Sequence, residues 1–137
     1  MKVTFVYPKF EKFLESVEKM SSDREFFTVG KFTCPPSLGI PILASVTPGD
    51  VEIDFDDGTD IYAINSFTPQ GTRALEIAAE CKARGKTVVA GGMFPSFMSE
   101  EFSGLVDSVC IGEGEYTWGE LLSDYKNGCL KPVYKSS

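Results

Sequence analysis

Two short apolar segments that end in glycine constrain the fold of this 137-residue chain more than any other feature. Residues 87–95 read TVVAGGMFP, and residues 109–115 read VCIGEGE. Buried parallel strands have this pattern where they bring backbone close to a ligand at the carboxyl edge of a sheet. Because the two segments are close in sequence, we expect neighbouring strands whose glycines share one site.

Apolar runs rich in β-branched residues predict the other strands, and apolar residues at helical spacing predict the helices. The predicted strands cover residues 2–7, 61–66, 86–90 and 106–111. The predicted helices cover residues 10–20, 38–46, 69–84, 99–105 and 116–127, with an irregular stretch at 24–37. Thr68 and Ser99 are the expected N-caps of two helices, and Gly85 and Gly128 are the expected C-terminal glycines of two helices.

Strands that alternate with helices indicate an α/β fold. We expect a doubly wound, flavodoxin- or Rossmann-like three-layer sandwich with a mostly parallel sheet. Right-handed crossovers would place the carboxyl ends of all strands at one edge. The chain length and the 42% hydrophobic content fit a single domain over residues 1–137.

The alternation is shortened around residues 51–60. Residues 51–55 have the pattern of a strand, but residues 56–60 are too few for a parallel crossover, which needs about a dozen or more. Either residues 51–55 turn back antiparallel through Asp57 and Gly58, or they are an extended lead-in to the strand at Ile61. In both cases we expect a thinly covered surface that is buried in a homodimer or against another domain.

The charge of the chain argues against several partners. Its net charge is −7, whereas proteins that bind nucleic acids or anionic membranes are usually basic. We therefore expect no nucleic acid and no membrane among its partners. The chain also has no apolar run long enough for a bilayer and no signal peptide at its first residues, so we expect a cytoplasmic protein.

The chain contains no histidine and four cysteines that are far apart in sequence. The lack of histidine excludes a Ser-His-Asp triad and a histidine metal ligand. The cysteine spacing excludes a Cys-x-x-Cys pair, a local zinc knuckle and the closely spaced cysteines of an iron–sulfur loop. Cys81 and Cys110 are therefore predicted to be small core residues.

Several stretches of the chain occur in the order found in one known family. They are residues 35–40 (PPSLGI), 60–69 (DIYAINSFTP), 83–92 (ARGKTVVAGG), 107–118 (DSVCIGEGEYTW) and 128–134 (GCLKPVY). Through them the chain resembles the N-terminal cobalamin-binding (B12-binding) domain of radical S-adenosylmethionine proteins. The Gly-Glu-Gly-Glu sequence with a following tryptophan is fairly specific, whereas the Gly-Gly pair alone would be a weak signal.

The resemblance implies a domain that holds a corrinoid at the carboxyl edge of its sheet, with the nucleotide tail among the strand ends. It places Ser66 and Thr68 near this tail, where hydroxyls can bond phosphate or ribose. It places Gly91 and Gly92 where a side chain would block the tail. The cofactor contacts predicted in this way are Tyr7, Ser66, Phe67, Thr68, Gly91, Gly92, Met93, Gly112, Glu113 and Gly114.

The chain also departs from the family pattern. Residues 7–11 (YPKFE) replace the Asp-x-His-x-x-Gly loop whose histidine ligates cobalt in the general cobalamin-binding family. Many radical S-adenosylmethionine members lack this histidine, so we expect cobalamin to bind without a histidine ligand. The chain ends about where the family's first domain ends. The iron–sulfur cluster and S-adenosylmethionine would then belong to a catalytic partner domain.

Two functions remain open at this point. The retained Gly-Gly and Gly-Glu-Gly-Glu sequences favour a corrinoid-binding module that presents its cofactor to a radical S-adenosylmethionine domain. The missing histidine and the short segment at 51–60 favour a cofactor-free domain that serves in dimerisation or docking. No catalytic residue is predicted, because Glu113 and Glu115 have no partner base or metal cluster nearby in sequence. Other α/β ligand-binding domains fit less well, because Pro8 and Lys9 follow the first strand. A receiver domain would have acidic residues there, a flavodoxin a Ser/Thr-rich phosphate loop, and a dinucleotide-binding domain a Gly-x-Gly-x-x-Gly sequence.

Overall fold

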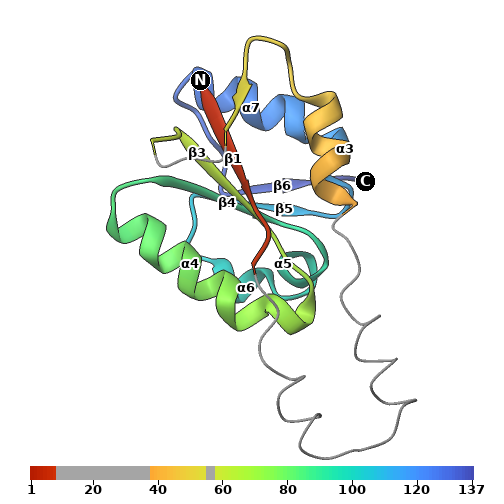
Figure 1. The fold of residues 1–137 in the computed structure, drawn as a ribbon. Helices are drawn as coiled ribbons and strands as arrows, with labels where there is room; N and C mark the ends of the chain where they lie inside the picture. The colour runs from red at the N-terminus through yellow and green to blue at the C-terminus, as the bar shows by residue number, and fades with distance from the viewer. Residues whose placement is uncertain (9–37, 55–57) are drawn as a thin grey trace, which may run out of the picture.

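The computed structural model describes residues 1–8, 38–54 and 58–137, and its strands form one sheet in which every pair is parallel (Figure 1). The order across the sheet is β2-β1-β3-β4-β5-β6. The strands are β1 (Lys2–Val6), β2 (Glu52–Ile53), β3 (Ile61–Asn65), β4 (Thr87–Gly91), β5 (Ser108–Ile111) and β6 (Val133–Lys135). This order is flavodoxin-like, with β6 added at one edge, and it confirms the predicted fold class.

Helices cover both faces of the sheet (Figure 1). One face carries α3 (Gly39–Val46) and α7 (Trp118–Lys126), and the other carries α4 (Gly71–Ala83), α5 (Met93–Phe97) and α6 (Ser99–Phe102). Short 3-10 turns, η1 (Thr68–Gln70) and η2 (Gly114–Tyr116), precede α4 and α7. The helix predicted at 10–20 and the irregular stretch predicted at 24–37 lie outside the described residues. Within the described part of the chain, no helix is both long and apolar enough to cross a bilayer.

The two faces of the sheet divide the hydrophobic core. Side chains alternate along each strand, so Phe5 and Val89 pack toward α7, while Val88 packs toward α4. The rings of Phe5 and Trp118 lie 5.6 Å apart between centroids. Cys110 is buried on the α7 face, as predicted for a core cysteine. Cys81, on α4, is buried on the opposite face, which confirms the same prediction.

The structure corrects the interpretation of residues 51–60. β2 neither turns back nor remains unpaired, because Ile53 pairs in parallel with Val3 of β1, and Val3 pairs on its other side with Ile61. β2 is only two residues long, and its last residue and the first residue of β3 pair with the same residue of β1, Val3. The Asp60 backbone N–H donates to the Lys2 carbonyl, and the Lys2 N–H donates to the Asp60 carboxylate. A crossover without a helix is possible here because the strand that it leaves is so short.

The predicted N-caps are also wrong. Phe67, not Thr68, precedes the first turn, and the cap of that turn comes from Gln70, whose side-chain oxygen accepts a hydrogen bond from the Phe67 N–H at 2.9 Å. The Gln70 amide also donates to the carbonyl of Pro8, which follows β1. Ser99 is the first residue of α6 and not its cap, which is Met98. Gly85 and Gly128 have φ of 72° and 70° after their helices, as predicted for C-terminal glycines.

The final strand, which the sequence analysis did not predict, reaches the sheet by an unusual crossover. The β3–α4–β4 and β5–α7–β6 units both run toward the β6 edge, yet α4 and α7 lie on opposite faces of the sheet. The two crossovers therefore have opposite hands, although nearly all such units share one hand. Tyr134 of β6 ties the strand to α7, because its hydroxyl donates to Asp124 at 2.7 Å and accepts from the Lys131 N–H at 3.1 Å.

This anchor predicts a stability effect for Tyr134→Phe. Removing the buried hydroxyl should lower the free energy of unfolding by about 1 kcal/mol at neutral pH, because both hydrogen bonds are lost. The hydrogen bond from Tyr134 holds the pKa of Asp124 below its ordinary value of 3.8. A lowered carboxyl pKa stabilises the fold above about pH 4, and this stabilisation is lost as the pH falls further. Thermal melts at pH 7 and pH 3 should therefore show a smaller difference between variant and wild type at pH 3. An equal or larger difference at pH 3 would contradict the assignment.

Candidate functional site

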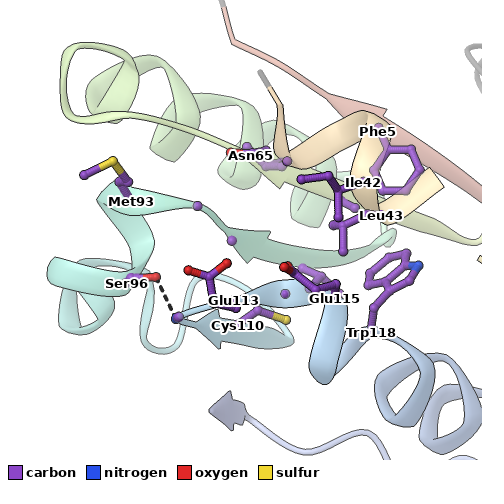
Figure 2. Close-up of a pocket in the computed structure, with 18 of the residues that line it drawn as sticks. Phe5, Ile42, Leu43, Asn65, Met93, Ser96, Cys110, Glu113, Glu115 and Trp118 are labelled. Carbon is purple, nitrogen blue, oxygen red and sulfur yellow. Dashed lines mark hydrogen bonds between the residues drawn. The ribbon is translucent and has the colours of Figure 1, made fainter. Parts of the chain in front are cut away.

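A cavity of about 450 Å³ opens at the carboxyl edge of the sheet, between the strand ends and α3 (Figure 2). Its volume is within the range of about 300–1,000 Å³ found for small-molecule sites. The described residues that line it are Phe5, Leu38, Gly39, Ile42, Leu43, Ala63, Ile64, Asn65, Phe67, Val89, Gly91, Gly92, Met93, Ser96, Phe97, Cys110, Gly112, Glu113, Gly114, Glu115 and Trp118. The structure thus brings both glycine-rich segments to one cavity, as expected from the sequence.

Most of the predicted cofactor contacts lie in this lining. They are Phe67, Gly91, Gly92, Met93, Gly112, Glu113 and Gly114. Tyr7, Ser66 and Thr68 are not among the lining residues. Ser66 follows the lining residue Asn65 but is itself fully buried and does not line the cavity. Thr68 is exposed in η1, so its place in the sequence beside the strand end does not bring it to the cavity.

Ser66 nevertheless holds the edge of the cavity together. Its backbone N–H donates to the Gly91 carbonyl at 3.2 Å, and its carbonyl accepts from the Phe94 N–H at 3.0 Å. Its buried Oγ has no hydrogen-bond partner among the residues that the structure describes. Buried hydroxyls are normally paired, so this oxygen is an exception, but it does not face the cavity.

The side chain of Asn65 lies close to two glycines, Gly39 and Gly92. A Cβ atom on Gly39 would clash with the Asn65 amide nitrogen, and one on Gly92 would clash with the amide oxygen. A side chain at Gly92 would also meet the Ser66 carbonyl oxygen at 2.9 Å, whereas one at Gly39 would require only a shift of the Asn65 side chain. The sequence analysis missed Gly39 and Asn65. The available signal was a polar residue at the end of an otherwise apolar strand.

The glycines around the cavity are not equivalent. Gly92 and Gly112 have φ of 98° and 87°, a backbone conformation that favours glycine. Gly91 is in the extended conformation of β4, and a Cβ atom there would make an ordinary contact with Cys110 Cβ at 3.6 Å. At Gly114 a Cβ atom would lie 3.3 Å from Leu43 Cδ2, which is tight. Backbone conformation therefore explains Gly92 and Gly112, whereas Gly91 leaves space that the fold does not need.

The loop after β5 is fixed by two serine side chains. The Gly112 N–H donates to Ser96 Oγ at 3.0 Å, and the Glu113 N–H donates to Ser136 Oγ at 2.7 Å. Glu113 and Glu115 are the charged residues in the described lining, which includes neither lysine nor arginine. Such a mouth disfavours a strongly anionic ligand and accepts hydrogen bonds from donors on a neutral or cationic one.

The inner part of the site has little reactive chemistry. Burial raises the pKa of the Cys110 thiol to about 11, although a hydrogen bond with Thr117 acts to lower it, so the thiol is neutral at pH 7. Among residues 1–8, 38–54 and 58–137, no group of three or more His, Cys, Asp or Glu side chains could hold a metal ion. The site can therefore pack against an apolar ligand, but its described side chains form no metal centre.

Helix α3, which the sequence analysis predicted as a helix over residues 38–46, forms one wall of the cavity. None of the residues of α3 is buried, and Leu38 and Ile42 are 69% and 43% exposed, because they border the open cavity. Across the mouth, Met93 and Phe97 of α5 are 54% and 76% exposed. These apolar side chains are explained by the cavity and not by the core of the isolated domain. A signal for such a wall was present in the short apolar sequence of residues 38–46, but it is the same signal that a core helix has.

Comparisons with known proteins agree with this geometry. No protein-family model matches the chain. The sequence is 44% identical over 110 residues to bacteriochlorophyllide d C-8(2)-methyltransferase of Chlorobaculum tepidum, a match that covers 72% of this chain and 24% of that protein. It is 38% identical over 98 residues to bacteriochlorophyllide d C-12(1)-methyltransferase of the same organism, which covers 72% of this chain and 21% of that protein. The chain thus spans less than a quarter of the length of each of these relatives.

A solved structure has the same fold. It is the cobalamin-dependent S-adenosylmethionine radical enzyme OxsB with aqua-cobalamin bound, with a TM-score of 0.59 and 20% sequence identity. The match covers 95% of this chain and 19% of the OxsB chain. Together these findings confirm the resemblance seen in the motifs, and the chain is related to the cobalamin-binding domains of radical S-adenosylmethionine proteins.

Proposed function

We propose that this chain is a corrinoid-binding module of a cobalamin-dependent radical S-adenosylmethionine enzyme. In this proposal the module holds the corrinoid at the carboxyl-edge cavity and presents it to a separate catalytic domain. The observation that carries the proposal is the cavity of about 450 Å³ at the ends of β3, β4 and β5, which has bare backbone at Gly91. The relatives and the structural neighbour support the assignment of this cavity to a corrinoid.

The residues present fit such a group. A large, partly apolar cofactor needs apolar walls, which α3 and the sheet provide on opposite sides of the cavity. A ligand can approach the backbone closely where a side chain is missing, as at Gly91. The fold itself would accept a Cβ atom at this position. The lining also presents hydrogen-bonding side chains to such a cofactor, at Asn65, Ser96 and Glu113. Binding would then depend on packing and hydrogen bonds, with no histidine ligand to the metal.

The bound corrinoid would supply the cobalt chemistry, while this chain's residues position the cofactor. The iron–sulfur cluster and S-adenosylmethionine would be held by the catalytic domain, which is the proposed partner. Both curated relatives are methyltransferases by name, which favours methyl transfer as the reaction of the whole enzyme.

A homodimer that covers the surface near residues 51–60 remains a further proposal, and light scattering at high concentration tests it.

Trp118 gives the proposal a direct measurement. It lines the cavity and is the only tryptophan of the chain. Adding hydroxocobalamin should quench its fluorescence in a saturable way, because corrinoids absorb in the region where tryptophan emits. The visible bands of the corrinoid should shift over the same concentration range, and the corrinoid should co-elute with the protein on gel filtration.

A control separates binding from simple absorption of light by the added corrinoid. Free N-acetyltryptophanamide at the same absorbance should show only linear attenuation, without saturation. If the protein gave the same linear response at tens of micromolar and the corrinoid eluted alone, the corrinoid proposal would fail. The alternative of a cofactor-free docking or dimerisation domain would then take its place.

A further inference from the structure

Four consecutive residues after β5 line the cavity. They are Gly112, Glu113, Gly114 and Glu115, which we call the β5 loop. Two of the four are glycines, and glycine loses more backbone freedom on ordering than any other residue. A ligand that had to order such a loop would bind less tightly than one that met it already ordered. Contacts that fix the β5 loop in the free protein would thus contribute to the affinity of a ligand.

Ser136, which follows β6, supplies such contacts. Its Oγ accepts a hydrogen bond from the Glu113 N–H at 2.7 Å, and its own N–H donates to the Ile111 carbonyl at 3.1 Å. The two bonds lie on either side of Gly112, so Ser136 spans the point at which the chain leaves β5 and enters the β5 loop. A Cβ atom on Gly112 would collide with Ser136 Oγ. The missing side chain at Gly112 therefore makes room for the serine hydroxyl.

Strand β6 brings Ser136 to this place. Lys135 of β6 pairs in parallel with Ile111, the last residue of β5, so the next residue along lies beside the start of the β5 loop. None of the described lining residues comes from β6, although the strand reaches the same edge of the sheet as the cavity. The strand that the unusual crossover adds to the sheet is therefore linked to the cavity through Ser136.

A second serine holds the β5 loop from the other side. Ser96 of α5 accepts a hydrogen bond from the Gly112 N–H at 3.0 Å, which Figure 2 shows as a dashed line. Ser96 also lines the cavity, so loss of its hydroxyl would change the lining as well as the loop. Ser136 is not among the described lining residues. An effect of its hydroxyl on a ligand in the cavity would consequently act through the β5 loop.

Building on the proposed function, we infer that Ser136 is a positioning residue for corrinoid binding, which fixes the β5 loop in its binding conformation before the cofactor arrives. Glu113 is exposed, so water can replace the serine hydroxyl when that hydroxyl is removed, and the fold loses little stability. The fixed conformation of the β5 loop is lost, however, because water does not hold the loop against β6. The cofactor then has to order the loop as it binds, and its affinity falls.

Three variants separate this role from a structural one. Hydroxocobalamin, titrated with Trp118 fluorescence and visible absorption as readouts, should bind Ser136→Ala at least fivefold more weakly than wild type, which corresponds to about 1 kcal/mol. Ser136→Thr keeps the hydroxyl and should bind within twofold of wild type. Ser137→Ala removes the same atom from the adjacent, exposed residue and should also bind within twofold of wild type. The Tm of each variant should change by less than about 4 °C.

Amide hydrogen exchange in the free protein tests the loop itself, without any corrinoid. The Glu113 N–H should exchange at least fivefold faster in Ser136→Ala than in wild type or in Ser137→Ala, because its acceptor is removed. Unchanged exchange, or wild-type affinity in Ser136→Ala, would overturn the inference and leave the proposed function standing. Weaker binding together with a loss in Tm of more than about 4 °C would also overturn it, because Ser136 would then serve stability. If the wild-type protein bound no hydroxocobalamin, the inference and the proposed function would both fall.

Discussion

Replacing Gly91 by leucine is expected to weaken hydroxocobalamin binding at least tenfold while the protein stays folded. Val89 and Gly91 lie on the same face of β4, so a side chain at 91 projects into the cavity. The fold accepts a Cβ atom at this position, since its nearest neighbour would be Cys110 Cβ at 3.6 Å. Tm should therefore change by less than about 4 °C, equivalent to about 1 kcal/mol in a chain of this size.

The same side chain placed elsewhere provides the control. Gly119 of α7 is exposed, and a Cβ atom there would meet nothing within 4 Å among the described residues. Gly119→Leu should therefore leave the affinity for hydroxocobalamin unchanged, as measured by the same fluorescence titration and by gel filtration. If Gly91→Leu folded normally and bound with wild-type affinity, the corrinoid would not occupy the space beside β4. The proposed site would then be wrong.

Replacing Gly92 by alanine is expected to reduce stability and not merely binding. The φ of 98° at this position disfavours every residue with a side chain. A Cβ atom would also lie 2.9 Å from the Ser66 carbonyl oxygen and clash with the Asn65 side chain. Backbone strain of this kind costs about 1–3 kcal/mol, and the contact adds to it. Tm should fall by about 6 °C or more.

Gly119→Ala is the matched control for this second prediction. It adds the same methyl group at an exposed position in the first turn of α7, where alanine is at least as favourable as glycine. Its Tm should rise slightly or stay the same in the same thermal melt. A Gly92→Ala variant as stable as wild type would show that the turn after β4 can relax, and that Gly92 is glycine for another reason. Gly92 is consequently a poor position at which to test cofactor binding, because a substitution there is expected to destabilise the fold as well.

The regular parts of the fold could be predicted because their signals are local. Residues 61–66, 86–90 and 106–111 are apolar strands bounded by turn residues, and the structure has strands in all three places. The helix that ends before Gly85 and the one that ends before Gly128 have regular apolar spacing and glycine stops. Helix α5 has only five residues and β6 only three, which are too few for the sequence period of either element to be recognised.

The errors have a common physical origin in contacts between distant residues. Thr68 has the residue type of an N-cap, but the buried side chain of Gln70 caps that turn while it also bonds the carbonyl of Pro8. β2 pairs in parallel because it needs only two residues beside β1. β6 depends on Tyr134 reaching Asp124 of α7. The contacts of Gln70 with Pro8 and of Tyr134 with Asp124 join residues too far apart to leave a local pattern in the sequence.

Sequence by itself determined the fold class, the edge of the sheet that carries the site and the chemistry that the site lacks. Strand and helix periods are properties of consecutive residues, and the absence of histidine is a property of composition. Only the tertiary structure decided that Gly91 leaves open space while Gly92 serves the backbone, and that the exposed apolar residues of α3 form a cavity wall. These distinctions depend on which atoms from distant parts of the chain lie next to each residue, and only tertiary packing determines these contacts.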